Sequence, residues 1–264
     1  MLSLVENLSK QTAEQLYGVL PHDFVTAYML FSLLDTFAVN GAWVQTVGDE
    51  VTALVIEKNQ TKAYVAANDL ADFEELRLFL RTLGGVVVHA APCYMKRLGV
   101  TAFSRHGLMV LETLPKTKRT AQTVTEDLKP IYRLLTQNAK AAAGDTMQYR
   151  HYAEKAYKEW LSTQTRGIFA GYTVVKAVYA QENALLSAAI ADVLGDFVYI
   201  RDVVTDADYR QMGYGRDCIA GLCKELKTEQ NKIFLLSGDL QTENFYKKCG
   251  FRREAAIELG IVEL

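Results

Sequence analysis

Apolar residues recur along the chain at two spacings, and the helical spacing is clearest in residues 69–85. There the apolar residues fall on one helical face, and Gly84 follows as a stop signal. That face consists of Phe73, Leu76, Leu80 and Leu83. Residues 13–37 carry a similar pattern that Pro21 interrupts, which predicts one or two helices.

Shorter apolar runs of strand character surround the 69–85 helix. The dipeptide Gly48-Asp49 separates the first two runs and predicts a hairpin turn. We expect strands at 42–47, 50–57, 62–67, 86–90 and 107–114, with a short helix at 92–100.

The second half begins after a polar segment, 115–123, that is typical of a linker. One helix should begin near Thr125 or Lys129, and another at Asp145, with Gln148 reaching back to the cap. Strands are expected at 171–180, 184–193, 197–205 and 232–239 and from 251 onward, with helices after 215 and at 242–250. The pattern predicts a mixed α/β fold with two domains, 1–120 and 121–264, and a largely antiparallel central sheet flanked by helices.

Composition narrows the classes of function. Of the 264 residues 50% are hydrophobic and 23% charged, and the net charge of −2 gives no general attraction to nucleic acid or anionic membranes. The four cysteines form no CxxC pair and have no histidine at zinc spacing, so we expect reduced, mostly buried thiols and no metal. Without a signal peptide or a long apolar run, a cytoplasmic protein is expected.

The stretch YRQMGYGRD, residues 209–217, places two glycines between two arginines ahead of a helical pattern. Gly213 and Gly215 permit a tight turn and close approach of a ligand, and Arg210 and Arg216 favour an anion. A helix N-terminus with free N–H groups suits a phosphate. A dinucleotide fingerprint would need glycine at Cys218, and a P-loop pattern is absent.

The same stretch resembles the acyl-CoA pyrophosphate loop of the GNAT superfamily of N-acyltransferases, whose pattern is [RQ]-x-x-G-x-[GA] before a helix. Residues 210–215 match it position by position. A second GNAT motif, F-Y-x-x-x-G-F, is matched by Phe245, Tyr246, Gly250 and Phe251. The resemblance covers roughly residues 121–264 and implies a GNAT fold there.

The resemblance also implies roles for individual residues. Acetyl-CoA would be the acyl donor, and its pantetheine arm would pair with the end of the 197–205 strand. Tyr246 would protonate the departing thiolate, and Asp192 or Asp202 are candidates for the base. Asp239 stands where many family members have asparagine, with Asn244 nearby. The donor-binding residues are then Val203, Val204, Thr205, Arg210, Gln211, Met212, Gly213, Tyr214, Gly215, Arg216, Asp239 and Asn244.

The first half repeats this order of elements but has no glycine loop ahead of its 69–85 helix. It is therefore interpreted as a degenerate, cofactor-free GNAT-like copy, with an unrelated α/β domain as the alternative. The predicted activity is transfer of an acetyl group to a primary amine of a small molecule or peptide. The alternative is a non-catalytic regulator that binds acyl-CoA.

Overall fold

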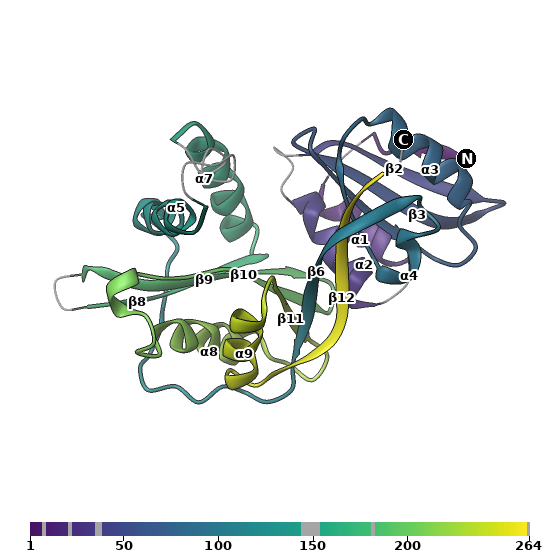
Figure 1. Cartoon of the computed structure of the whole chain (residues 1–264). Helices are drawn as coiled ribbons and strands as arrows, with labels where there is room; N and C mark the ends of the chain where they lie inside the picture. The colour runs from purple at the N-terminus through teal and green to yellow at the C-terminus, as the bar shows by residue number, and fades with distance from the viewer. Residues whose placement is uncertain (7–8, 21–22, 35–38, 144–153, 181–182, 263–264) are drawn as a thin grey trace. The chain divides into compact units, whose positions relative to one another are not determined.

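The computed structural model describes residues 1–6, 9–20, 23–34, 39–143, 154–180 and 183–262 (Figure 1). The chain forms two compact units. Unit 1 comprises Met1–Met109, Leu236–Glu243 and Arg253–Leu264, and unit 2 comprises Val110–Leu235 and Asn244–Arg252. The helix start predicted at Asp145 and Gln148 lies outside the described residues.

The first half of the chain alternates strands and helices in the predicted order. Gly48 and Asp49 connect β2 and β3 as predicted, with Gly48 at a φ of 61°. The elements are β1 (Leu2–Leu4), α1 (Lys10–Tyr17), α2 (Phe24–Phe31), β2 (Val39–Val47), β3 (Glu50–Lys58), β4 (Lys62–Ala67), α3 (Phe73–Thr82), β5 (Val87–Ala90), α4 (Pro92–Met95) and β6 (Val100–Leu111).

The second half follows the same sequence of elements. They are β7 (Gln122–Thr123), α5 (Lys129–Ala143), α7 (Glu154–Phe169), β8 (Thr173–Tyr179), β9 (Leu185–Leu194), β10 (Phe197–Thr205), a 3-10 turn (Ala207–Tyr209), α8 (Tyr214–Leu226), β11 (Lys232–Ser237), α9 (Leu240–Lys248) and β12 (Phe251–Val262).

Strand pairing is also the same in the two halves. In each, the first four strands pair antiparallel in sequence order, β1 to β4 and β7 to β10. In each, the fourth strand then pairs in parallel with the fifth, β4 with β5 and β10 with β11. This mixed, mostly antiparallel arrangement confirms the predicted fold class.

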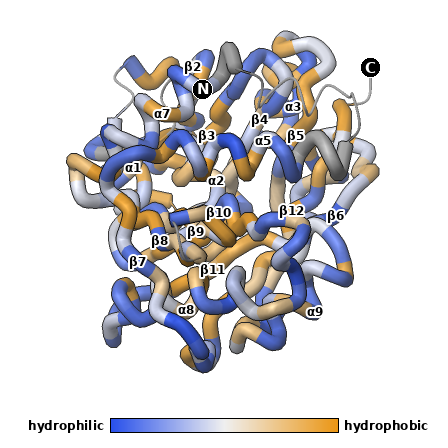
Figure 2. Tube along the Cα trace, turned by 90° about the vertical axis from the view of Figure 1, so that its left-hand side faces the viewer, coloured by the Kyte–Doolittle hydropathy of each residue, from blue (hydrophilic) through white to orange (hydrophobic). Residues whose placement is uncertain are grey.

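In unit 2, α5 and α7 cover one face of the sheet and α8 covers the other (Figure 1). The apolar residues of α5 pack on alternate residues of β8 and β9, because successive side chains of a strand point to opposite faces. Figure 2 shows β9, β10 and β11 as largely apolar. This buried sheet gives β10 and the loop that follows it a rigid base.

In unit 1, α3 packs its predicted face on β3, β4 and β5. Phe73, Leu76 and Leu80 are buried, and Leu83 packs on the edge of the same cluster. A later part of the chain also joins this sheet, because β12 pairs antiparallel with β5 from Glu258↔Ala90 to Ile261↔Val87.

The structure differs from the sequence reading at β6. The predicted strand at 107–114 begins earlier, at Val100, and the helix before it has only four residues. The helix ends at Met95, and Gly99, with a φ of 65°, is the last residue of the turn that follows it, directly before the strand. Within the described parts of the chain, no helix combines the length and apolar character of a segment that crosses a bilayer.

Candidate functional site

The glycine loop leaves the start of α8 without a side-chain cap. Gly213 is the N-cap residue at φ 90° and ψ 0°, and as a glycine it has no side chain to accept a hydrogen bond from the first turn. A Cβ at Gly213 would meet no heavy atom of the described residues within 4 Å. Uncapped N–H groups at a helix N-terminus form a binding position for an anion.

The other glycine of the loop has a different function from the predicted turn. Gly215 lies within α8, and a Cβ there would stand 3.1 Å from Thr205 Oγ1 and 3.5 Å from the Phe245 ring. A side chain at Gly215 would therefore crowd Thr205. The left-handed turn is made by Gly213 together with Gln211, whose φ is 63°.

These contacts bring the two sequence motifs together. Phe245, from the second motif, lies against the first turn of α8, and Tyr246 follows it in α9. The Tyr246 side chain is 8% exposed, and its ring lies 5.2 Å from that of Phe245 and 6.3 Å from that of Phe251. About thirty residues of sequence separate two motifs that are adjacent in unit 2.

The strand β10 stops pairing with β11 several residues before the loop. Its parallel pairing with β11 ends at Ile200↔Leu235, while its pairing with β9 resumes at Val204↔Ala188 after a bulge. Asp202, inside the bulge, has a φ of 51°. The backbone of residues 201–205 thus has an edge beyond the β11 ladder, where an extended ligand could pair.

The end of β10 is held by side chains that the sequence did not single out. Ser187 Oγ donates to Val204 O at 2.7 Å, and Asn138 Nδ2 donates to Thr205 O at 3.1 Å. The other end of the Asn138 amide accepts from the Arg210 guanidinium. Asn138 therefore connects α5 to both the strand and the loop, and Arg210 is exposed beside it.

A cation from the segment before β7 also reaches the loop. Arg119 Nη1 donates to Met212 O at 3.3 Å and to Asp217 Oδ2 at 3.0 Å, and its guanidinium lies 4.2 Å from the centre of the Tyr214 ring. The Lys118 N–H donates to the other oxygen of Asp217 at 3.0 Å. This region was interpreted only as a polar linker from the sequence.

The two candidate bases belong to one ion-pair network. Arg201 Nε donates to Asp192 Oδ2 at 2.5 Å, and its Nη1 donates to Asp202 Oδ2 at 2.6 Å. Gln164 Oε1 accepts from the same guanidinium at 2.8 Å, and Asp192 Oδ1 also accepts from Thr173 Oγ1 at 2.7 Å. Although burial opposes the charge, the two carboxylates raise the pKa of Arg201 and keep it cationic. Both aspartates are thereby ion-paired.

Three further predicted residues have distinct surroundings. Asp239 is exposed and caps α9, accepting from Thr242 N at 2.7 Å, and this bond holds its pKa below the usual value. Asn244 is exposed on the same helix. Arg216 turns its Nε into the protein, where among the described residues it finds no hydrogen-bond partner, and its guanidinium lies beside the Cys249 thiol.

The thiols are mostly buried, as predicted. Cys218, Cys223 and Cys249 are buried, and burial raises the pKa of the first two to about 12 and of the third to about 11. Cys93 is exposed. The three buried thiols therefore stay protonated at neutral pH and act as small apolar side chains.

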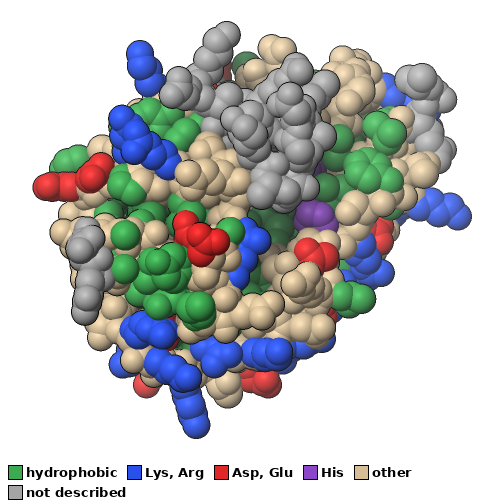
Figure 3. Space-filling view, turned by 60° about the vertical axis from the view of Figure 1, so that its left-hand side comes forward, with side chains coloured by type: hydrophobic (Ala, Val, Ile, Leu, Met, Phe, Trp, Pro, Cys, Tyr) green, Lys and Arg blue, Asp and Glu red, His purple; other side chains and the backbone are tan. Residues whose placement is uncertain are grey.

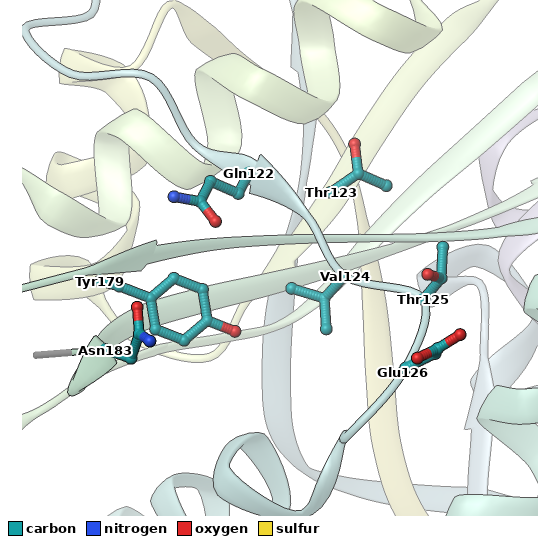
Figure 4. Close-up of a pocket in the computed structure, with 7 residues that line it drawn as sticks. All are labelled: Gln122, Thr123, Val124, Thr125, Glu126, Tyr179 and Asn183. Carbon is teal, nitrogen blue, oxygen red and sulfur yellow. The ribbon is translucent and has the colours of Figure 1, made fainter.

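The surface view adds the distribution of charge. Lys and Arg side chains gather along the lower edge of Figure 3, at the level of α8 and α9 in Figure 1. A cavity of about 290 Å³ lies elsewhere in unit 2, at β7 and β8 (Figure 4). Its lining residues, none of them a predicted site residue, are Gln122, Thr123, Val124, Thr125, Glu126, Tyr179 and Asn183.

Comparison with known proteins identifies the second half. Residues 127–251 match the family model described as Acetyltransferase (GNAT) family. These residues form a GNAT acetyltransferase domain, as the two motifs predicted. No curated protein sequence matches this chain.

Solved structures resemble the chain over almost its whole length. An acetyltransferase from the GNAT family of Colwellia psychrerythraea has a TM-score of 0.60 at 11% identity, with 99% of both chains covered. A GCN5-related N-acetyltransferase from Kribbella flavida has a TM-score of 0.57 at 15% identity, with 98% of both covered. A tandem GNAT protein from the clavulanic acid biosynthesis pathway has a TM-score of 0.60 at 10% identity, covering 100% of this chain and 99% of that one. At these identities the likeness concerns the fold alone, and it agrees with a two-copy arrangement.

Proposed function

We propose that this protein is an N-acetyltransferase that moves an acetyl group from acetyl-CoA to a primary amine of a small molecule or peptide. The observation that carries the proposal is the convergence of three features in unit 2. They are the uncapped helix start at Gly213, the unpaired edge at the end of β10, and Tyr246 in the adjacent motif. With free thiols, we place the protein in the cytoplasm.

The pyrophosphate of acetyl-CoA would bind at the N-terminus of α8. The helix begins at Gly213 without a side-chain cap, and Arg210 offers an exposed guanidinium near this helix start. The pantetheine would extend along β10 beyond Ile200, where residues 203–205 offer backbone groups. An N–H on this edge would stabilise negative charge on the thioester oxygen.

The reaction balances with one proton transferred overall. The amine nitrogen forms a bond to the thioester carbon, the C–S bond breaks, and the proton lost by the nitrogen ends on the sulfur. Tyr246 would supply that proton to the thiolate and regain one from the acceptor nitrogen through solvent. We assign neither Asp192 nor Asp202 as the base, because Arg201 holds both carboxylates.

The test combines binding with turnover. Calorimetric titration of the full chain with acetyl-CoA should show one site, and saturation at 100 times Kd should stabilise the fold by about 2.7 kcal/mol. NAD should produce no comparable effect. A panel of primary amines is then assayed for release of free CoA thiol.

The outcomes separate the two predicted classes of function. Thiol release with one or more amines supports the enzyme. Binding of acetyl-CoA without turnover across a broad panel would instead support a non-catalytic regulator. A chain that does not bind acetyl-CoA refutes both.

A further inference from the structure

The residues just before β7 cross the first turn of α8, and one of them contacts the loop at three points. We propose that Arg119 is a positioning residue for the anion-binding loop: it fixes the loop backbone and neutralises a buried carboxylate beneath it. This inference rests on the proposed function. Arg119 lies outside both GNAT motifs in the sequence, in the middle of the polar segment 115–123.

The contacts of Arg119 surround the turn at Gly213. Its Nη1 donates to the carbonyl of Met212, the residue immediately before the turn, and its guanidinium stacks on Tyr214, the residue immediately after it. One planar cation thus holds both sides of a glycine whose φ of 90° few other residues adopt. Fixing this turn keeps the N–H groups of α8 directed at a bound phosphate.

The same guanidinium controls the charge below the loop. Asp217 lies in the first turn of α8 and is 2% exposed. Among the described residues, Arg119 is the cation that forms an ion pair with it, at 3.0 Å. Without that partner, a buried negative charge would remain in the same turn that receives the pyrophosphate, and it would repel the ligand.

The two arginines of the loop motif cannot replace Arg119 in this role. Arg210 is bonded to Asn138 on α5, and the guanidinium of Arg216 turns toward Cys249. Arg119 is the partner of Asp217 and is 38% exposed, so its charge also contributes to the field in front of the helix.

The experiment measures CoA and acetyl-CoA affinity by calorimetry and kcat at saturating acetyl-CoA. In Arg119→Ala the Kd for CoA should rise about tenfold or more, the size of effect expected from an unpaired charge a few ångströms from a bound anion. The kcat at saturation should stay within about threefold, since Tyr246 is untouched. Lys118→Ala is the matched control, because Lys118 contributes only its backbone N–H to Asp217.

A double variant tests the charge mechanism. If Arg119 acts by neutralising Asp217, Arg119→Ala combined with Asp217→Asn should recover most of the lost affinity. Affinities of Asp217→Asn and of the double variant should then agree within about threefold, a comparison that holds even if Arg119→Ala alone fails to fold. Arg119→Lys should bind CoA more tightly than Arg119→Ala, because it keeps the charge.

Failure of the proposed function and failure of the inference about Arg119 give different results. If the wild-type protein does not bind CoA, the proposed function fails and this inference falls with it. If the wild-type protein binds CoA and Arg119→Ala binds it equally well, only this inference is overturned. A tenfold difference between Asp217→Asn and the double variant would overturn the charge mechanism, because Arg119 would then act through its contacts with Met212 and Tyr214 and not through Asp217.

Discussion

The two halves of the chain contain the same order of elements and the same strand pairing, yet they present different chemistry where the fourth strand passes into the following helix. In unit 1 a side chain of the protein caps the N–H groups at the start of α3. Asp72 accepts from the N–H groups of Glu74 and Glu75, and both of those residues add negative charge to the first turn. In unit 2 the equivalent helix begins at Gly213 with no side-chain cap.

The strands that lead to these helices differ as well. The β3–β4 ladder is regular along β4, whereas β10 contains the bulge at residues 201–204. Elsewhere the units are alike: Tyr64 stacks on His89 at 4.5 Å, and Tyr199 stacks on Phe234 at 5.2 Å in the corresponding parallel pair. The comparison teaches that one architecture can present a capped, acidic helix start or an uncapped one, depending on a few residues at one turn.

The largest expected effect is a difference in kcat between variants of Tyr246, in the helix after β11, and of Tyr94, in the helix after β5. Tyr246→Phe keeps the ring and removes the hydroxyl, so kcat should fall by about 10²–10⁴-fold with little change in acetyl-CoA affinity. Steady-state kinetics with calorimetry checks both quantities. Tyr94→Phe makes the same substitution in α4, the short helix of unit 1, and its kcat should stay within threefold of the wild-type value.

A normal kcat in Tyr246→Phe together with a lowered melting temperature would make Tyr246 a packing residue. That outcome would remove the catalytic difference between the units.

The second prediction gives unit 2 the acidic helix start of unit 1. Gly213→Asp places a carboxylate at the anion position, and CoA affinity should fall about 100-fold by charge repulsion. Gly213→Asn is the matched control, since both residues tolerate a left-handed φ and only the aspartate carries charge. Calorimetric Kd values that agree between the two variants would mean that the loop does not bind an anion.

The third prediction concerns His89, which stands where unit 2 has Phe234. Burial, with smaller contributions from Lys62, His106 and Lys58, lowers the pKa of His89 to about 3. The unfolded chain takes up a proton near pH 6.5 and the folded chain does not, so this contribution to stability is complete above pH 6.5 and decreases as pH falls toward 3. Between pH 7 and pH 5 the loss should be about 2 kcal/mol.

Urea unfolding followed by Trp43 fluorescence, with Trp160 replaced by Phe, reports on unit 1 because the chain has two tryptophans. His89→Phe should reduce the difference between pH 7 and pH 5 by about the same 2 kcal/mol. An unchanged pH dependence in that variant would show that His89 is protonated in the folded protein.

The smallest effect tests the cap of unit 1. Asp72→Ala removes the bonds to two N–H groups of α3 and should cost about 1 kcal/mol of stability, with no change in CoA affinity. Denaturation and calorimetry measure the two quantities. Asp69→Ala, which removes an exposed carboxylate paired with Arg97, should change stability by less. Weakened CoA binding in Asp72→Ala would mean that unit 1 contributes to the donor site.

Local patterns predicted much of this structure. The helical face of α3, the hairpin at Gly48 and the glycine loop depend on neighbouring residues, so the sequence contains them. The two GNAT motifs predicted a site because each carries backbone and side-chain requirements within ten residues. The bulge at Asp202 was not predicted, since it results from the pairing of β10 with two other strands.

Residues that act across long sequence separations were also missed. Arg119 stands 98 positions before Asp217, and no spacing rule relates a polar linker to a helix start. The sequence likewise gives no signal that distinguishes Asn138 from the other residues of α5, although its amide donates a hydrogen bond to Thr205 O. Such partners become visible only when the chain is folded.

The pairing of β5 with β12 has a consequence for how the protein is made. About 160 residues separate the two strands, and at a synthesis rate of about 5–20 residues per second the ribosome needs on the order of 10–30 seconds between them. Throughout that interval the nascent chain carries an incomplete first sheet whose β5 edge still awaits its partner. A cell producing this protein must protect that edge from other chains, and slower translation would lengthen the exposure.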